Sequence, residues 1–346
     1  MPYFSVKSFS LWLAALACLP LGSIANAEAI QWVTVGDPGN TADTAPAGFG
    51  AVATSFRIMK FEFTNQQYTD FLNSVDSSGT NPYSVYNTSM GSNARGGITN
   101  TGSTNGSRYA VKTDMGDKPV NYVSWFDAAR VANWLMNGAT SSSDTETGAY
   151  TLVGGQTSGI TPAVNSGATF SVPTEDQWYK AAYYKGGGTS VGYWNYATQN
   201  DSAPTAVAAG ETGIGSAGST GNFAYYNSNA DWKGQDGNVT TVGTNGGPSF
   251  YGAFDMSGNV YEWNDLTGAS VSSRGLRGGG FAPISAFDLS SSGSISYDPS
   301  GEDSVIGFRL ASPVSGPSGV PEIDPSGLSA VLGLLFGGLG LLERRR

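Results

Sequence analysis

The 346-residue chain alternates short apolar islands with long polar stretches. The polar stretches are rich in Gly, Ser, Thr and Asn, and they cover residues 77–117, 140–168 and 186–221. They carry too little apolar surface to form cores of their own, so we interpret them as long surface loops of one domain. The apolar islands between them are therefore expected to supply the strands and helices of the core.

The first island predicts strands that run into a helix. Its apolar positions nearly alternate, which is typical of one or two strands; they are Val52, Phe56, Ile58, Phe61 and Phe63. Thr64 then stands three residues before Gln67, the spacing of a capping box at a helix start. The next apolar residues share one helical face; they are Tyr68, Phe71, Leu72 and Val75.

Two more islands repeat this helix-start pattern. Ser124 precedes Asp127, and Thr174 precedes Gln177, each by three residues. The predicted inward faces hold Ala128, Val131, Ala132 and Leu135 in one helix and Trp178, Ala181 and Ala182 in the other, with Gly138 and Gly186 as the stops. The first-turn acids Asp127, Glu175 and Asp176 are expected to stabilise helix N-termini rather than to do chemistry. Three capped helices joined by long loops predict an α+β domain.

Residues 1–27 have the pattern of a secretory signal peptide. Lys7 precedes an apolar run from Leu11 to Leu21, and Ala25-Asn26-Ala27 follows it. We expect cleavage after Ala27 and export of the protein, with the domain covering residues 28–312. Lipidation at Cys18 is the alternative, although Ala15 stands where a lipobox usually has Leu.

Residues 313–346 are expected to form a linker and a sorting tail. The apolar run Leu328–Leu342 is followed at once by Glu343-Arg344-Arg345-Arg346. As a helix it reaches about 22 Å against a bilayer core of about 30 Å, so it suits a transient stop signal held by a basic tail. With Val320-Pro321-Glu322 upstream, this end resembles a PEP-CTERM signal, although Ile323 replaces the usual second Pro. The resemblance implies an exosortase-type partner and transient membrane contact; the alternative is an ordinary C-terminal anchor.

Composition excludes several classes of function. The formal net charge is −10, and the 17 Lys and Arg residues form no basic cluster in the expected domain, which argues against nucleic acid as a partner. Cys18 is the one cysteine and falls in the expected signal peptide, so the mature chain has no disulfide. The chain has no His, which excludes Ser/His/Asp catalysis and zinc sites built from His and Cys.

Six motifs in order carry a resemblance to a known family. They are the Thr64–Tyr68 helix start, 118–125 (KPVNYVSW), 172–178 (VPTEDQW), 258–263 (GNVYEW), 276–280 (LRGGG) and 307–310 (GFRL). Together, over residues 45–312, they resemble the formylglycine-generating enzyme (sulfatase-modifying factor) family. The resemblance implies a loop-rich, single-domain variant of the C-type-lectin-like fold, in the α+β class.

The resemblance also implies two structural calcium sites. The first maps to the side chains of Asn222 and Asp236 and the backbone oxygens of Phe223 and Asn238. The second maps to the carboxylates of Asp255 and Glu262 and the carbonyls of Gly258 and Val260. Oxygen donors around a Gly-containing turn suit calcium. The alternative is that Asp236 and Asp255 form ordinary turns.

The family's oxidase activity is not expected here. Its oxidases use a pair of cysteines after the Gly-Gly motif, where this chain has Pro283 and Asp288. Neither replaces the soft thiolate that Cu(I) chemistry needs. The related iron-dependent sulfoxide synthases need His ligands, which are absent. A mechanism with two carboxylates is left open by composition, with Asp265 and Asp288 as candidates only by default.

The sequence thus predicts an exported, non-catalytic member of this family that contains structural calcium. Its long loops would bind a glycan or a protein at the cell surface or in an extracellular matrix. The alternatives are an enzyme of altered chemistry on the same scaffold and a matrix component with no defined ligand.

Overall fold

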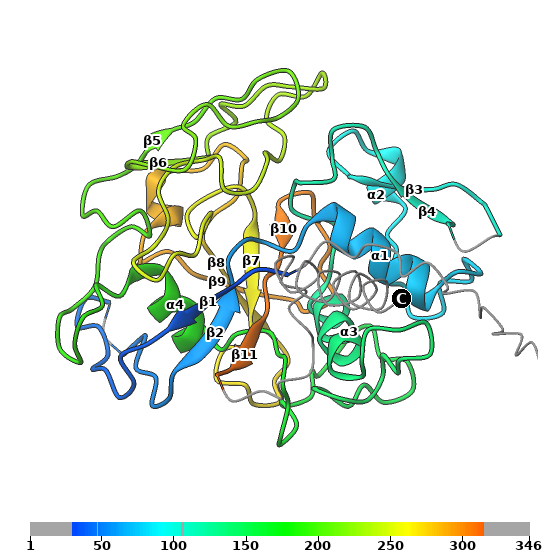
Figure 1. Cartoon of the computed structure of the whole chain (residues 1–346), viewed down its shortest axis with the longest axis horizontal. Coiled ribbons are helices and arrows are strands. Elements are labelled where there is room, and N and C mark those ends of the chain that lie inside the picture. The colour runs from blue at the N-terminus through cyan, green and yellow to red at the C-terminus, as the bar shows by residue number, and fades with distance from the viewer. Residues whose placement is uncertain (1–29, 47, 105–106, 315–346) are drawn as a thin grey trace, which may run out of the picture.

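Short strands form the centre of the molecule, with α1 and α3 on one side, α4 on the other and long loops crowded at one end (Figure 1). The computed structural model describes residues 30–46, 48–104 and 107–314. The expected signal peptide and all of the expected tail except residues 313 and 314 lie outside these residues. None of the helices in this part of the chain has the length and hydropathy needed to cross a bilayer.

The first sheet joins the two ends of the domain. It has three strands in the order β1 (Trp32–Val35), β2 (Phe56–Met59) and β11 (Ala311–Pro313). Both outer strands run antiparallel to β2, with Trp32 opposite Met59 and Ala311 opposite Ile58. The last strand of the domain, β11, therefore pairs with the edge of β2 that β1 leaves open.

The second sheet supports the candidate site. Its order is β10 (Ile306–Gly307), β7 (Tyr261–Asn264), β8 (Arg274–Arg277) and β9 (Ile295–Tyr297). β7 runs parallel to β10 and antiparallel to β8, and both β7 and β8 are buried throughout. Two small pairs complete the strands: β3 (Ile98–Asn100) with β4 (Tyr109–Val111), and β5 (Thr205–Ala206) with β6 (Phe223–Ala224).

The three predicted helix starts are confirmed. α1 (Asn65–Val75), α3 (Trp125–Met136) and α4 (Glu175–Tyr183) each begin after a complete capping box. The N-caps are Thr64, Ser124 and Thr174, as the spacing predicted. The structure adds a short helix α2 (Ser89–Ser92) and a 3₁₀ turn η1 (Ala286–Leu289).

The strand prediction was too long, and one helix stop was misplaced. β2 ends at Met59, because the backbone of Phe63 pairs with Phe308 and Val120 instead of continuing the strand. Val52 and Phe61 also lie outside the strands. α4 ends at Tyr183, three residues before Gly186, because Tyr184 is already extended.

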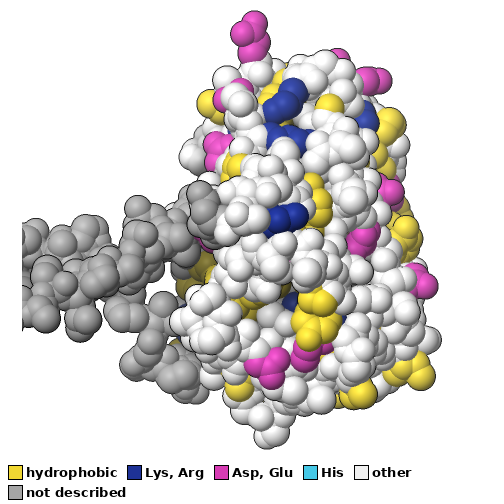
Figure 2. Space-filling model, turned by 90° about the vertical axis from the view of Figure 1, so that its right-hand side faces the viewer, with side chains coloured by type: hydrophobic (Ala, Val, Ile, Leu, Met, Phe, Trp, Pro, Cys, Tyr) yellow, Lys and Arg dark blue, Asp and Glu magenta, His cyan; other side chains and the backbone are white. Residues whose placement is uncertain are grey.

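Three groups of buried apolar side chains hold these elements together. The largest lies between α1, α3 and the second sheet and includes Trp125 and Trp263. A second joins α4, through Trp178, to the first sheet. A third lies under the loops and includes Trp232. On the face shown in Figure 2, charged side chains are few and scattered, in keeping with a chain that is 13% charged.

Candidate functional site

A tight turn from Asp255 to Val260 leads into β7 and sets the geometry of the predicted second calcium site. Asp255 and Asn259 have left-handed backbones, with φ of 56° and 64°. Gly258 has φ +95°, and a Cβ there would lie 2.1 Å from the carbonyl oxygen of Tyr225. Only glycine fits this close approach, so the motif residue is required for shape.

Glu262 lies in a fully buried ion pair with Arg309. The Arg309 Nε and Nη2 atoms donate to the two carboxylate oxygens at 2.6 and 2.7 Å, and Trp178 Nε1 adds a third bond at 2.8 Å. Neither charged side chain is exposed. Arg309 also donates to the carbonyls of Met59 and Phe254, at 3.0 and 2.8 Å. The pair therefore ties α4, β2 and β7 to the segment before β11.

Two further carboxylates lie close to this pair. Asp255 accepts from the Gly243 amide at 2.6 Å and from Asn245 at 2.8 Å, and burial raises its pKa. Glu62 is fully buried and accepts from Asn259 at 2.8 Å and from the Val260 amide at 3.2 Å. Burial, followed by the charges of Asp255 and Glu262, raises the pKa of Glu62 well above its ordinary value. Sequence reasoning missed Glu62, although it directly precedes the Phe63-Thr64 helix start.

The second predicted site fits calcium by its charge but not by its geometry. Glu62, Asp255 and Glu262, if all are ionised, carry two more negative charges than Arg309 balances. Each carboxylate nevertheless points to donors of its own. Among the described residues, no group of three or more Asp, Glu, His or Cys side chains is arranged to hold a metal. Glu262 would have to share its oxygens with Arg309, so calcium at this turn stays a prediction.

The residues of the first predicted site have separate neighbours. Asn222 accepts from the Thr198 hydroxyl at 2.6 Å and donates to Ser202 at 3.1 Å. Asp236 is exposed, and its carbonyl accepts from Arg95 at 2.8 Å. Phe223 begins β6 and is 38% exposed.

Asn238 is the member of this set whose environment suits a ligand. It is fully buried, and within the described part of the chain neither Nδ2 nor Oδ1 of its side chain has a hydrogen-bond partner. Buried polar groups are seldom left unpaired. The prediction named the backbone oxygen of Asn238, whereas the orphaned atoms belong to its side chain.

The default carboxylate candidates do not form a pair. Asp265 is fully buried and accepts from Trp125 Nε1 at 2.8 Å and from the Tyr150 hydroxyl at 2.7 Å. Arg274 Nε lies 3.2 Å from the same carboxylate, an ion-pair distance without hydrogen-bond geometry. Burial raises the pKa of Asp265 to about 6. Asp288 instead caps η1 through Ser285, so the structure gives the two carboxylates different partners.

The first-turn acids of the helices have structural partners. Glu175 pairs with Arg277 at 2.7 Å, and Asp176 accepts from the Gly50 amide at 2.8 Å. Asp127 completes its capping box, as expected, and is also hydrogen-bonded to Glu302, a contact that sequence gave no means of finding. Two carboxyl groups form such a bond only when one keeps its proton. Burial raises the pKa of Asp127 to about 6, while burial and the charge of Asp127 raise that of Glu302 to about 8.

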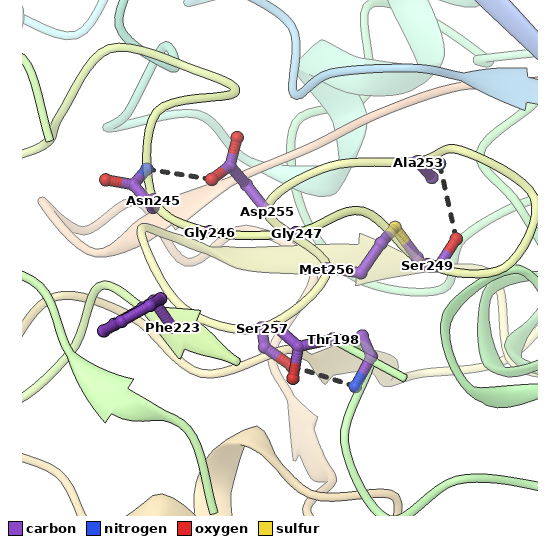
Figure 3. A pocket seen from close by; sticks show the side chains of 11 residues that line it. Thr198, Phe223, Asn245, Gly246, Gly247, Ser249, Ala253, Asp255, Met256 and Ser257 are labelled. Atoms are coloured by element: carbon purple, nitrogen blue, oxygen red, sulfur yellow. Dashed lines mark hydrogen bonds between the residues drawn. The ribbon is translucent and has the colours of Figure 1, made fainter. Parts of the chain in front are cut away.

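A small pocket adjoins the turn before β7 (Figure 3). Asn245 and Asp255 meet on one side of it, and Thr198, Phe223 and Ser257 lie on the other. Its free volume of about 10 Å³ leaves room for about one water molecule. It is too small for an organic substrate.

The sequence matches one protein family over most of its length. The family described as "Sulfatase-modifying factor enzyme 1-like domain" matches residues 22–314. The mixed, loop-rich single domain agrees with the variant C-type-lectin-like fold that was expected of this family. No curated protein matches the chain.

Several solved structures are similar to this chain. CarF is 21% identical, with a TM-score of 0.48, over 83% of this chain and 99% of that one. Variable protein 1 of Treponema denticola is 20% identical, with a TM-score of 0.48, over 82% and 94%. PvdO from Pseudomonas aeruginosa is 18% identical, with a TM-score of 0.41, over 82% and 92%. These similarities concern the fold alone.

Proposed function

Since the chain belongs to the sulfatase-modifying factor enzyme 1-like domain family, we propose that it uses this fold as an exported binding domain. In this proposal the buried charged groups hold the scaffold in shape, and the long loops bind a glycan or a protein at the cell surface. The family's oxidase chemistry is not part of the proposal, because Pro283 and Asp288 stand where thiolates would be needed.

Residues 184–260 combine little regular structure with exposed apolar side chains, and this combination supports the proposal. This long segment contains two strands of two residues each, β5 and β6. It also carries four of the large apolar side chains that stay exposed, namely Val191, Ile214, Phe223 and Phe250. Exposed apolar side chains on ordered loops are typical of binding surfaces.

Calcium is proposed as a structural ion of this loop region. The gathering of Glu62, Asp255 and Glu262 around the cation Arg309 supports the second site, because calcium would stabilise their ionised forms. The side chain of Asn238, which has no hydrogen-bond partner among the described residues, supports the first. A bound calcium ion would balance charge and fix the turns, and it has no part in a reaction.

Export and sorting are proposed from the two ends of the sequence. Mass spectrometry of the protein released by its native host should find Glu28 at the N-terminus. A cut near Pro321 would support the exosortase proposal. A retained C-terminal Arg346 in membrane fractions would support the ordinary anchor instead.

The binding proposal is tested with purified protein on arrays of glycans and of extracellular proteins. We expect at least one ligand to bind, and Ile214→Ser with Phe250→Ser to weaken it. Val153→Ser and Phe287→Ser remove apolar side chains outside this segment that are more exposed than Ile214 and Phe250, and they serve as controls. Absence of any ligand would refute the proposal in favour of a matrix component. Conversion of a sulfatase Cys peptide to formylglycine would show that the protein has oxidase activity after all.

A further inference from the structure

A cleft opens between three loop segments at the end of the molecule that carries β5 and β6. We call it the loop cleft; its polar lining consists of Thr198, Gln199, Asn200, Ser219, Thr220 and Asn222, with Gly221, Gly247 and Pro248 between them. Its volume is about 380 Å³. Ligand pockets span roughly 300–1,000 Å³, so the cleft suits a small ligand or the end of a longer one.

The walls of the loop cleft are tied to one another by hydrogen bonds. The Thr198 hydroxyl donates to Asn222 Oδ1 at 2.6 Å, which joins the first wall to the second. Gln199 Nε2 donates to the Pro248 carbonyl at 3.1 Å, and the Gly247 amide donates to the Gly221 carbonyl at 2.8 Å. The cleft therefore exists before a ligand arrives, which lowers the entropy cost of binding.

No charged side chain of the described residues lines the loop cleft, and the polar side chains in its lining are hydroxyls and carboxamides. Among the described residues that form it, none is Asp, Glu, Lys, Arg or Tyr, although the chain as a whole carries a net charge of −10. A charged ligand would lose water there without meeting a counter-charge, which is costly. Hydroxyl and carboxamide groups both donate and accept, so they match a ligand whose own groups do the same.

An aromatic side chain, Phe223, directly follows the cleft residue Asn222 and belongs to the lining of the neighbouring small pocket. Phe223 lines that pocket, which shares Thr198 and Gly247 with the cleft. The side chain is 38% exposed, so part of its ring is free for contact. Sugar rings present one apolar C–H face and a rim of hydroxyls, and this combination fits an aromatic ring beside uncharged polar groups.

We infer that the loop cleft binds a neutral saccharide of one or two sugar rings, with the Phe223 ring against its apolar face. The inference rests on the proposed binding function and names the ligand class and the place. Because none of the described side chains that line the cleft is charged, binding at a fixed calcium concentration depends little on monovalent salt or on pH.

The test uses the full protein with neutral gluco-, manno-, galacto- and N-acetylglucosamine oligosaccharides, and with sulfated sugars of the same length. Ser219→Trp fills the mouth of the cleft, and Ser272→Trp places the same ring at an exposed residue outside it. Phe223→Ala removes the aromatic face, and Phe287→Ala is its exposed control. Thermal unfolding of each variant shows whether it is folded.

The expected result is binding of a neutral oligosaccharide that Ser219→Trp abolishes and Phe223→Ala weakens about 3- to 10-fold, the share of one aromatic contact. Both controls should bind like the wild type, at about 0.05 M and at about 0.5 M salt alike. Unchanged binding by Ser219→Trp and Phe223→Ala would overturn the cleft assignment while leaving the proposed function standing. Salt-sensitive binding of sulfated sugars alone would overturn the ligand class. Failure of every glycan to bind, with a protein ligand found instead, would also overturn the inference but not the proposed function.

Discussion

Replacing Arg309 by Met is the sharpest test of how the buried charges hold the domain together. The substitution keeps the apolar stem but removes a guanidinium that makes two bonds to Glu262 and one each to the carbonyls of Met59 and Phe254. Glu262 would then stay fully buried with Trp178 Nε1 as its remaining donor, beside the carboxyl of Glu62.

The expected loss in the free energy of unfolding follows from leaving the Glu262 carboxylate buried without its cation. Breaking a buried ion pair by removing one partner costs about 3–5 kcal/mol. At about 2–4 °C per kcal/mol for a domain of this size, Tm should fall by about 6–20 °C. The double variant Glu262→Leu/Arg309→Met should be less destabilised than the sum of the two single variants, because no unpaired charge remains.

Urea unfolding followed by tryptophan fluorescence measures the loss, with and without calcium. The control is Lys185→Met, which removes a partner from a partly exposed ion pair of 3.9 Å with Asp201. Such surface pairs contribute about 0–1 kcal/mol. If Arg309→Met costs no more than Lys185→Met, the buried pair does not stabilise the fold as argued.

Three further predictions concern metal, protons and backbone. Chelation of calcium should lower Tm in the wild type but have a smaller effect in Asp255→Asn; equal effects in both would contradict the second calcium site. The pKa of Glu302 is raised to about 8 by burial and by Asp127, so the bound proton stabilises the fold at acid pH and this stability is lost as pH rises through about 8. Glu302→Gln should therefore gain stability relative to the wild type from about pH 5 to about pH 9 in thermal melts, and a constant difference would refute the shared proton. In urea unfolding, Gly187→Ala should cost roughly 1–2 kcal/mol, the cost of a left-handed backbone alone, because Gly187 has φ +81° and open space around it. Gly258→Ala should cost more, because its Cβ would also clash with the carbonyl oxygen of Tyr225.

Local rules explain which parts of the fold could be predicted from the sequence. The three capping boxes depend on side chains within three residues of the helix start, so they could be found without a structure. The end of β2 could not, because Phe63 leaves the strand to pair with Phe308 and Val120, which are distant in the chain.

The same limit applies to the site. The Gly-containing turn around Gly258 was predicted, but the buried strand β7 that follows it and holds Glu262 was not. The partners of this turn and strand were not predicted either, because Arg309 reaches Glu262 across 47 positions and Glu62 reaches Asn259 across 197. Sequence spacing shows which oxygen atoms lie around a turn. The hydrogen-bond donors that bind those oxygens come from distant parts of the chain, so only the folded structure shows them.

The pairing of β2 with both β1 and β11 bears on when the domain can fold. Arg57 in β2 donates to Ser312 in β11 across 255 positions, so this contact waits until almost the whole domain has been synthesised. Contacts this distant make folding slow, since the loop between them must close first. The unfolded chain thus keeps one edge of β2 open until its last segment is available. Truncation before Ala311 would leave that edge free to pair with another molecule.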